Sequence, residues 1–321
     1  MLRLILLSSL LLPVAAPLHA QGAWPDHPLR IIVPFPPGGP ADVLARITGV
    51  EITQALGPAV VIENKPGAGG NIGMEQGAKA AADAYTLTLA PVGNLTVSPY
   101  IYSKLPYDPV KDFVPVTVLA AVPNVLVVHP SLGVKSLRDL ITLAKAKPGT
   151  LNFASPGNGS GPHLAGELLK RMAGIDLVHV PYNGVAPAMN AVVAGDVQLF
   201  FAQTSAALPQ VKAGKVVALG VASLRRIDAA PELPTIAESG LPGFDVTSWY
   251  SIVAPAGTPP ERVARLQQVI AKAFARPEVR EKIAGLGAEP VADTPAEFAA
   301  LLRTEAERWR TLARDANIHA D

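Results

Sequence analysis

The chain of 321 residues contains no cysteine, and this absence excludes several kinds of site at once. Disulfides, thiol nucleophiles and thiolate metal ligands all need that side chain. A basic excess is also missing, since 27 Lys and Arg residues stand against 26 Asp and Glu residues. Nucleic-acid binding needs clustered positive charge, and base stacking needs aromatic residues, which make up only 5% of the chain. We therefore expect no nucleic-acid partner.

Long hydrophobic runs are absent too, apart from a short one near the N-terminus. Arg3 is followed by an apolar run over residues 4–16, and small or neutral residues continue to Ala20. A membrane-spanning helix needs roughly 20 apolar residues. A basic start, a short apolar run and a small exit residue are instead typical of a secretory signal peptide. We predict a signal peptide over residues 1–20 and a periplasmic location for the remainder.

Hydrophobic residues make up 49% of the chain and charged residues 17%, which is enough for a sizeable core. Short β-rich runs alternate with helical stretches, and several of these runs are apolar throughout, as in strands covered on both faces. The predicted strands are 29–35, 60–64, 85–90, 114–120, 124–129, 151–155, 176–181, 197–202, 216–223 and 248–255. This alternation predicts an α/β fold of mostly parallel sheets flanked by helices.

Helix boundaries can be read from four places. Residues 41–57 repeat apolar positions at helical spacing and stop at a glycine, and residues 136–149 start at a Ser cap. TPPE (258–261) and TPAE (294–297) each place Thr three residues before Glu, with proline at the first helical position. Both patterns predict a capping box at the start of a C-terminal helix.

The length suits two domains better than one. We expect one lobe from residues 24–123 together with 245–321, and a second lobe from residues 124–244. The run 121–130 would carry the chain to the second lobe, and 240–255 would carry it back. Two crossover strands would then join the lobes and act as a hinge near 122–126 and 248–253.

The segment PFPPGGPADVLAR (34–46) is the first candidate binding loop, because a strand runs into a Pro-Gly loop and then into a helix. Glycine lets a ligand approach the backbone, and free N–H groups at a helix start attract anions. Asp42 stands in the first helical turn, where its carboxylate either caps the helix or contacts a ligand. The sequence leaves both alternatives open.

The second candidate loop lies within NFASPGNGSGPHLAGELLKR (152–171). Ser155, Asn158 and Ser160 add hydroxyl and amide groups to the backbone donors. The loop lacks the GxxxxGK[ST] pattern, so it does not indicate nucleotide binding. Neither glycine-rich loop contains Lys or Arg. An anion there would be held by backbone amides, hydroxyls and waters.

Two further loops are less specific. KPGAGGNIG (65–73) lacks a true GxGxxG and is interpreted as mainly structural. In VPYNGVAPAMN (180–190), Tyr182 either closes over a ligand or lies in the core.

Catalytic signatures are missing. The chain has no GxSxG and no HExxH, and its histidines are dispersed. Ser160 and His163 would suit a nucleophile and a base, but no orienting acid can be identified. A lone His is more often a packed residue than a catalyst. We predict no enzymatic activity, no metal site and no cofactor.

In these loops and the segments around them, the chain resembles the Bug family, the extracytoplasmic receptors of tripartite tricarboxylate transporters. The resemblance covers nearly the whole chain after the predicted signal peptide. It is carried by six ordered blocks, namely 24–46, 60–73, 151–174, 179–201, 207–223 and 234–259.

The resemblance implies a two-lobed periplasmic binding protein of a type II-like fold, with a cleft that closes around a small organic acid. A single carboxylate of the ligand would be held by two strand–helix loops, one from each lobe. The ligand-binding residues implied are Phe35, Gly38, Gly39, Pro40, Asp42, Asn94, Ser155, Pro156, Gly157, Ser160, His163, Tyr182, Gln203 and Thr204. Two positions depart from the family pattern, because Asn183 stands where Lys or Arg is frequent and Gln203 where Asp is frequent.

The implied function is capture of a small carboxylate by a monomeric receptor and its delivery to the membrane permease subunits of a tripartite tricarboxylate transporter. A ligand-dependent co-receptor for a sensor kinase is an alternative. A secreted hydrolase using Ser160 and His163 is a more remote one.

Overall fold

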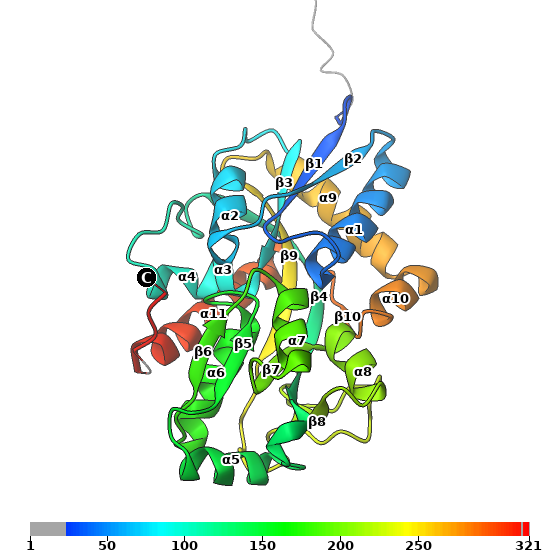
Figure 1. The fold of residues 1–321 in the computed structure, drawn as a ribbon. Coiled ribbons are helices and arrows are strands. Elements are labelled where there is room, and N and C mark those ends of the chain that lie inside the picture. Colours follow the sequence, from blue (N-terminus) through cyan, green and yellow to red (C-terminus); the bar gives the residue numbers. More distant parts are fainter. Residues whose placement is uncertain (1–23, 316, 321) are drawn as a thin grey trace, which may run out of the picture.

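The chain forms two α/β lobes joined by long strands that run between them (Figure 1). The computed structural model describes residues 24–315 and 317–320, so the predicted signal peptide lies outside the described residues. The predicted two-lobed architecture with two crossover strands is confirmed. Within the described residues, no helix combines the length and the apolar character that crossing a bilayer requires.

Lobe 1 is built on a sheet in the strand order β2-β1-β3-β9-β4, with β10 on β4. Its strands are β1 (Leu29–Val33), β2 (Val60–Asn64), β3 (Thr86–Pro91), the first part of β4 (Phe113–Val128), β9 (Thr247–Pro255) and β10 (Glu289–Pro290). Strand β1 is parallel to β2 and β3, whereas β9 is antiparallel to both β3 and β4.

Lobe 2 continues from the second part of β4 in the order β4-β7-β5-β6, with β8 on the other side of β4. The strands are β5 (Asn152–Ser155), β6 (Val178–Pro181), β7 (Leu199–Gln203) and β8 (Val217–Val221). Strand β5 is parallel to β6 and β7, while β4 is antiparallel to β7 and β8. The prediction of mostly parallel sheets is therefore corrected to mixed sheets, because the crossover strands β4 and β9 enter them antiparallel to their neighbours.

Helices cover both faces of each sheet. In lobe 1, one face carries α1 (Pro40–Leu56), α9 (Pro260–Phe274) and α10 (Pro277–Ala284), and the other carries α2 (Asn71–Ala78), α3 (Val92–Thr96) and the start of α11 (Pro295–Asp315). The short helix α4 (Ser98–Ile101) follows α3 and packs Ile101 in a core cluster with residues of lobe 2. In lobe 2, α5 (Leu137–Ala146) and α6 (Gly161–Ala173) pack on one face, and α7 (Val185–Ala194) and α8 (Thr204–Lys212) on the other. Two short 3-10 helices span Ala68–Gly70 and Pro130–Leu132.

Most of the predicted helix boundaries are observed. Helix α1 ends at Gly57, whose φ of 97° favours glycine, and the Ser136 hydroxyl accepts a 3.1 Å hydrogen bond from the Asp139 amide at the start of α5. The Thr294 amide donates to the Glu297 carboxylate (2.9 Å), as a capping box requires.

The capping box predicted at 258–261 is wrong. Pro259, rather than Thr258, is the N-cap of α9 and offers no capping side chain. The Thr258 hydroxyl instead donates to the Pro255 carbonyl (2.7 Å) at the end of β9.

The strands predicted at 114–120 and 124–129 are one continuous strand, β4. It pairs with β9 as far as Pro123 and with β7 from Asn124 onward, so the chain changes lobes between these two residues. The return crossing lies between Val246, whose amide donates to Ala222 in lobe 2 (2.7 Å), and Thr247, which pairs with Pro123. This position precedes the expected hinge at 248–253.

Helix α11 contacts both lobes, so residues 245–321 do not all belong to lobe 1 as expected. Phe298, near its start, lies in a lobe 1 core. Trp309, further along, packs in a core cluster with Leu164 of lobe 2. A helix of 21 residues is about 30 Å long, which is enough to extend from one lobe to the other.

Candidate functional site: a cavity between the lobes

A cavity lies between the two lobes. It encloses about 670 Å³ of empty space, counted out into the solvent at its open mouth. Its walls are Phe35, Pro36, Pro37, Gly39, Pro40, Ala41, Pro91, Val92, Gly93, Asn94, Pro156, Ser160, Gly161, Pro162, Asn183, Gly184, Val185, Ala186, Pro187, Gln203, Ser248, Trp249 and Tyr250.

Five helices begin at this cavity, and their N-caps Gly39 (α1), Pro91 (α3), Ser160 (α6), Gly184 (α7) and Gln203 (α8) all line it. The three longest of them are α1, α6 and α7. The first N–H groups of a helix have no partner inside the helix, and they form its positive end. Because α1 belongs to lobe 1 and α6 and α7 to lobe 2, positive helix ends reach the cavity from both lobes. The arrangement favours an anion.

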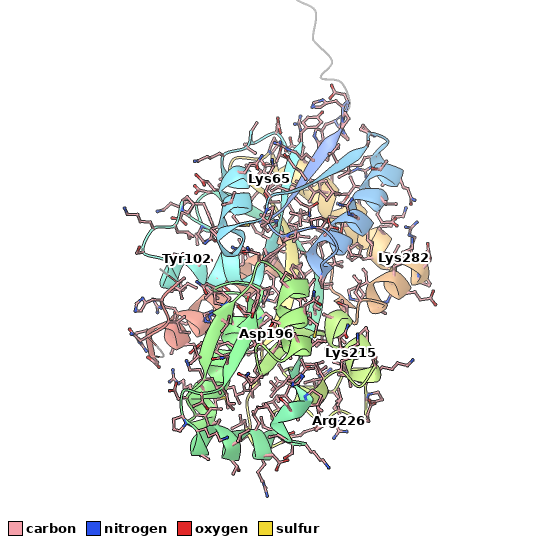
Figure 2. The ribbon with its side chains drawn as sticks, viewed as in Figure 1. Lys65, Tyr102, Asp196, Lys215, Arg226 and Lys282 are labelled. Atoms are coloured by element: carbon pink, nitrogen blue, oxygen red, sulfur yellow. The ribbon has the colours of Figure 1, made fainter. Side chains whose placement is uncertain are left out.

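The cavity walls contain no Asp, Glu, Lys, Arg or His. Charged side chains such as those of Lys215, Arg226 and Lys282 are exposed at the outer surface of the molecule (Figure 2). An anion bound in the cavity would therefore be stabilised by backbone dipoles and neutral hydrogen-bond donors rather than by a salt bridge.

Asp42 shapes the loop between β1 and α1. Its buried carboxylate accepts hydrogen bonds from the Gly38 amide (3.0 Å), from Arg46 (2.9 and 3.0 Å) and from Asn64 (3.0 Å). Burial alone would raise the pKa of Asp42, but these bonds outweigh it and hold the pKa below its ordinary value. Neither Asp42 nor Gly38 lines the cavity, and the helix N-cap is Gly39. The carboxylate therefore organises the loop, and it uses the Gly38 amide to do so.

The loop between β5 and α6 is held in a similar way. The Ser155 hydroxyl accepts from the Gly157 amide (3.1 Å) and lies 2.6 Å from the His179 ring. The His163 ring accepts from the Gly159 amide (3.0 Å) and stacks on His179 at 3.9 Å between ring centroids. These side chains fix the backbone of the loop through hydrogen bonds to its amides, although Ser155 and His163 do not line the cavity themselves.

The pairing of Ser160 with His163 that a hydrolase would need is absent. The Ser160 hydroxyl donates to the Gly157 carbonyl (2.7 Å), and the His163 ring is occupied by the Gly159 amide. Burial lowers the pKa of His163 well below its ordinary value, so the ring is neutral. In the part of the chain that the structure describes, no group of three or more metal-ligating side chains is arranged around a common point.

The residues predicted for the site fall into three groups. Seven of them line the cavity, namely Phe35, Gly39, Pro40, Asn94, Pro156, Ser160 and Gln203. Gly157 and Tyr182 line a second, neighbouring cavity that shares Phe35, Pro36, Pro156, Asn183 and Gly184 with the first. Gly38, Asp42, Ser155, His163 and Thr204 line neither.

Other cavity residues escaped the sequence-based prediction. Residues 91–93 and 185–187 lie where a helix begins after a strand or a loop, which is the same signal that marked the two glycine-rich loops. Residues 248–250 carry no such signal. They reach the cavity because β9 lies between β3 and β4, and that pairing is not evident from sequence spacing.

Glycines bring the lobes into close contact beside the cavity. A Cβ atom on Gly93 of lobe 1 would overlap the Gly159 carbonyl oxygen of lobe 2, and a Cβ on Gly69 would lie 2.9 Å from the Asn158 carbonyl oxygen. The loop 65–73, interpreted from sequence as mainly structural, thus forms part of the contact between the lobes. The structure shows the two lobes closed against each other.

Two α/β lobes, two crossover strands and an interlobe cavity ringed by helix N-termini define a solute-binding receptor. A family model described as "Tripartite tricarboxylate transporter family receptor" matches residues 44–318, and the chain belongs to this family.

Among its relatives, Protein BugT of Bordetella pertussis is 38% identical over 303 residues, which are 94% of this chain and 93% of that protein. A solved R. palustris protein with adipate is 36% identical and superimposes with a TM-score of 0.88, covering 92% of this chain and 99% of the other. MatC from Rhodopseudomonas palustris with bound malate is 34% identical, with a TM-score of 0.84 over 90% of this chain and 99% of the other.

Proposed function

We propose that this protein is a periplasmic receptor that captures a small organic carboxylate between its lobes and delivers it to the membrane subunits of a tripartite tricarboxylate transporter. The observation that carries the proposal is the convergence of α1, α6 and α7 from two lobes on one cavity without charged walls. Two further findings support it. The chain belongs to a family of transporter receptors, and the two similar R. palustris structures contain the carboxylates adipate and malate.

The proposed mechanism is binding without chemistry. The backbone N–H groups at the starts of α1, α6 and α7 take the carboxylate oxygens, and neutral amides on the walls complete the shell. Closure at the crossings near Asn124 and Thr247 brings the helices of the two lobes around the same anion. Opening at the same crossings would release it to the permease.

A thermal-shift panel tests the capture step directly. The chain without residues 1–20 is heated with aliphatic, hydroxylated and aromatic mono- and dicarboxylates. A ligand at 100 times its dissociation constant stabilises the folded state by about 2.7 kcal/mol, so a genuine ligand gives a clear rise in Tm. No shift with any acid, up to millimolar concentration, would contradict the proposal.

The delivery step is tested separately. We expect the liganded, monomeric receptor to be retained by the purified membrane subunits of a tripartite tricarboxylate transporter, and the unliganded receptor to be retained less. Retention by the outer domain of a sensor kinase instead would assign the same capture step to signalling.

Fractionation of cells expressing the full chain should place the shortened protein in the periplasm.

A further inference from the structure

The cavity contains a polar pair that comes from both lobes. Gln203 ends β7 in lobe 2, and Tyr250 lies in β9 of lobe 1. The Gln203 amide nitrogen donates a 2.5 Å hydrogen bond to the Tyr250 hydroxyl. Both residues line the cavity, and only 2% of Gln203 and 5% of Tyr250 are exposed. The pair therefore joins the lobes inside the site.

This pair has hydrogen-bonding capacity to spare. The side-chain oxygen of Gln203 is buried and has no hydrogen-bond partner. A buried polar atom without a partner is unfavourable, and such atoms are rare in folded proteins. Tyr250 accepts the bond from Gln203 and keeps its own hydroxyl hydrogen to donate. The pair thus offers a ligand one acceptor and one donor.

Both groups are uncharged. Burial raises the pKa of Tyr250 to about 12, so the phenol keeps its proton at neutral pH. The remaining walls are mostly apolar and include Phe35 and Val92, and the one further buried polar side-chain atom of the walls without a partner is the neutral indole N–H of Trp249. A second carboxylate or an ammonium group placed against these walls would lose its hydration without gaining an opposite charge. A neutral group that both donates and accepts would satisfy the pair.

We infer that this receptor selects monocarboxylates whose far end is an uncharged carboxamide or hydroxyl group, and that Gln203 and Tyr250 bind that end. The inference rests on the proposed function, because it takes the helix N-termini as the site of the ligand's one carboxylate. The expected selectivity differs from what the adipate and malate structures would suggest for this chain, since both of those ligands carry two carboxyl groups.

The test is isothermal titration at pH 7.5 with probes matched in length. Succinate is compared with succinamate and 4-hydroxybutyrate, and adipate with adipamate and 6-hydroxyhexanoate. At the chain length that binds best, the monoamide or the hydroxy acid should bind at least tenfold more tightly than the diacid. A diacid that binds as tightly at both lengths would overturn the inference, because the helix N-termini would then hold both carboxylates.

Two variants test the assigned residues. In Gln203→Leu and Tyr250→Phe, the preference for the neutral far end should fall to within about twofold of the diacid. Gln54→Leu makes the same change on the exposed side of α1 and should keep the wild-type preference. An unchanged preference in both cavity variants would overturn the assignment, and circular dichroism of each variant verifies its fold.

The same titrations separate this inference from the proposed function. If carboxylates bind but diacids are preferred, only the inference on Gln203 and Tyr250 fails. If no acid in the thermal-shift panel or in this series binds, the proposed function fails and the inference fails with it.

Discussion

Asp42 shows how one side chain can prepare a binding loop without facing the ligand. Its carboxylate accepts four hydrogen bonds and fixes the turn that leads into α1. From the sequence, Asp42 could be placed in the first helical turn. That its carboxylate does not line the cavity follows from its hydrogen bonds to Arg46 and Asn64, which the sequence does not show. Asn64 lies 22 residues further along and reaches Asp42 only because β2 pairs with β1.

Replacement of Asp42 by Asn should destabilise the fold. A neutral amide cannot accept all four bonds, and hydrogen bonds to a charged group contribute about 1.5–3 kcal/mol. We expect urea denaturation of Asp42→Asn to show a loss of that order in the free energy of unfolding. Asp228→Asn, at an exposed position, is the matched control. A loss no larger than that of the control would show that the loop does not depend on this carboxylate.

Gly93 should control closure. A methyl group there meets the Gly159 backbone of the opposite lobe, whereas the backbone conformation of Gly93 itself is open to alanine. Forcing atoms into filled space destabilises the closed state by about 1–3 kcal/mol, and each 1.4 kcal/mol is a tenfold change in affinity. Gly93→Ala should therefore bind its carboxylate about five- to a hundredfold more weakly.

Titration calorimetry measures the effect of Gly93→Ala, and Gly285→Ala, in a helix end away from the cavity, is the control. Wild-type affinity in Gly93→Ala would mean that the lobes bind ligand without closing as the structure shows.

At the scale of elements, the strand–loop–helix units could be predicted from the sequence. Which other strands and helices pack against each unit could not. Apolar runs, caps and glycines indicated β1 with α1 and β5 with α6, because those signals are local. The continuity of β4 and the path of α11 depend on contacts between segments more than a hundred residues apart. Gln203 was predicted for the site, but its hydrogen bond to Tyr250 follows from the closing of two lobes and no local pattern encodes it.

His163 of α6 is buried and stacks on the half-buried His179 of β6, and this histidine pair should make stability depend on pH. Burial, with Lys170 nearby, lowers the pKa of His179 to about 4, and burial and the neighbouring His179 lower that of His163. The unfolded chain takes up these protons near pH 6.5 and the folded chain does not. Stability should fall as the pH drops from 6.5 toward 4, by at most about 1.4 kcal/mol per pH unit for each ring.

Urea denaturation at several pH values measures this slope. His179→Gln should have a shallower slope between pH 6.5 and 4, because one of the two neutral rings is removed. An identical slope in the variant would mean that other groups set the pH dependence, such as carboxylates whose pKa is lowered in the folded state, Asp42 among them.

At the scale of the whole molecule, the lobes share structural elements. Strand β4 belongs to both sheets, and one core cluster combines Ile101 of lobe 1, Leu164 of lobe 2 and Trp309 of α11. We expect the lobes to unfold together, so that calorimetry shows one transition with equal calorimetric and van't Hoff enthalpies. Two resolved transitions would show that the lobes are independent despite these shared elements.

The central claim is that helix N-termini from both lobes hold one carboxylate in the cavity between them. A crystal structure of the chain with the tightest-binding acid from the panel tests it most directly. We expect carboxylate oxygens within hydrogen-bonding distance of backbone N–H groups at the starts of α1 and α6. A carboxylate found in the neighbouring cavity beside Tyr182, or paired with a cationic side chain, would contradict it.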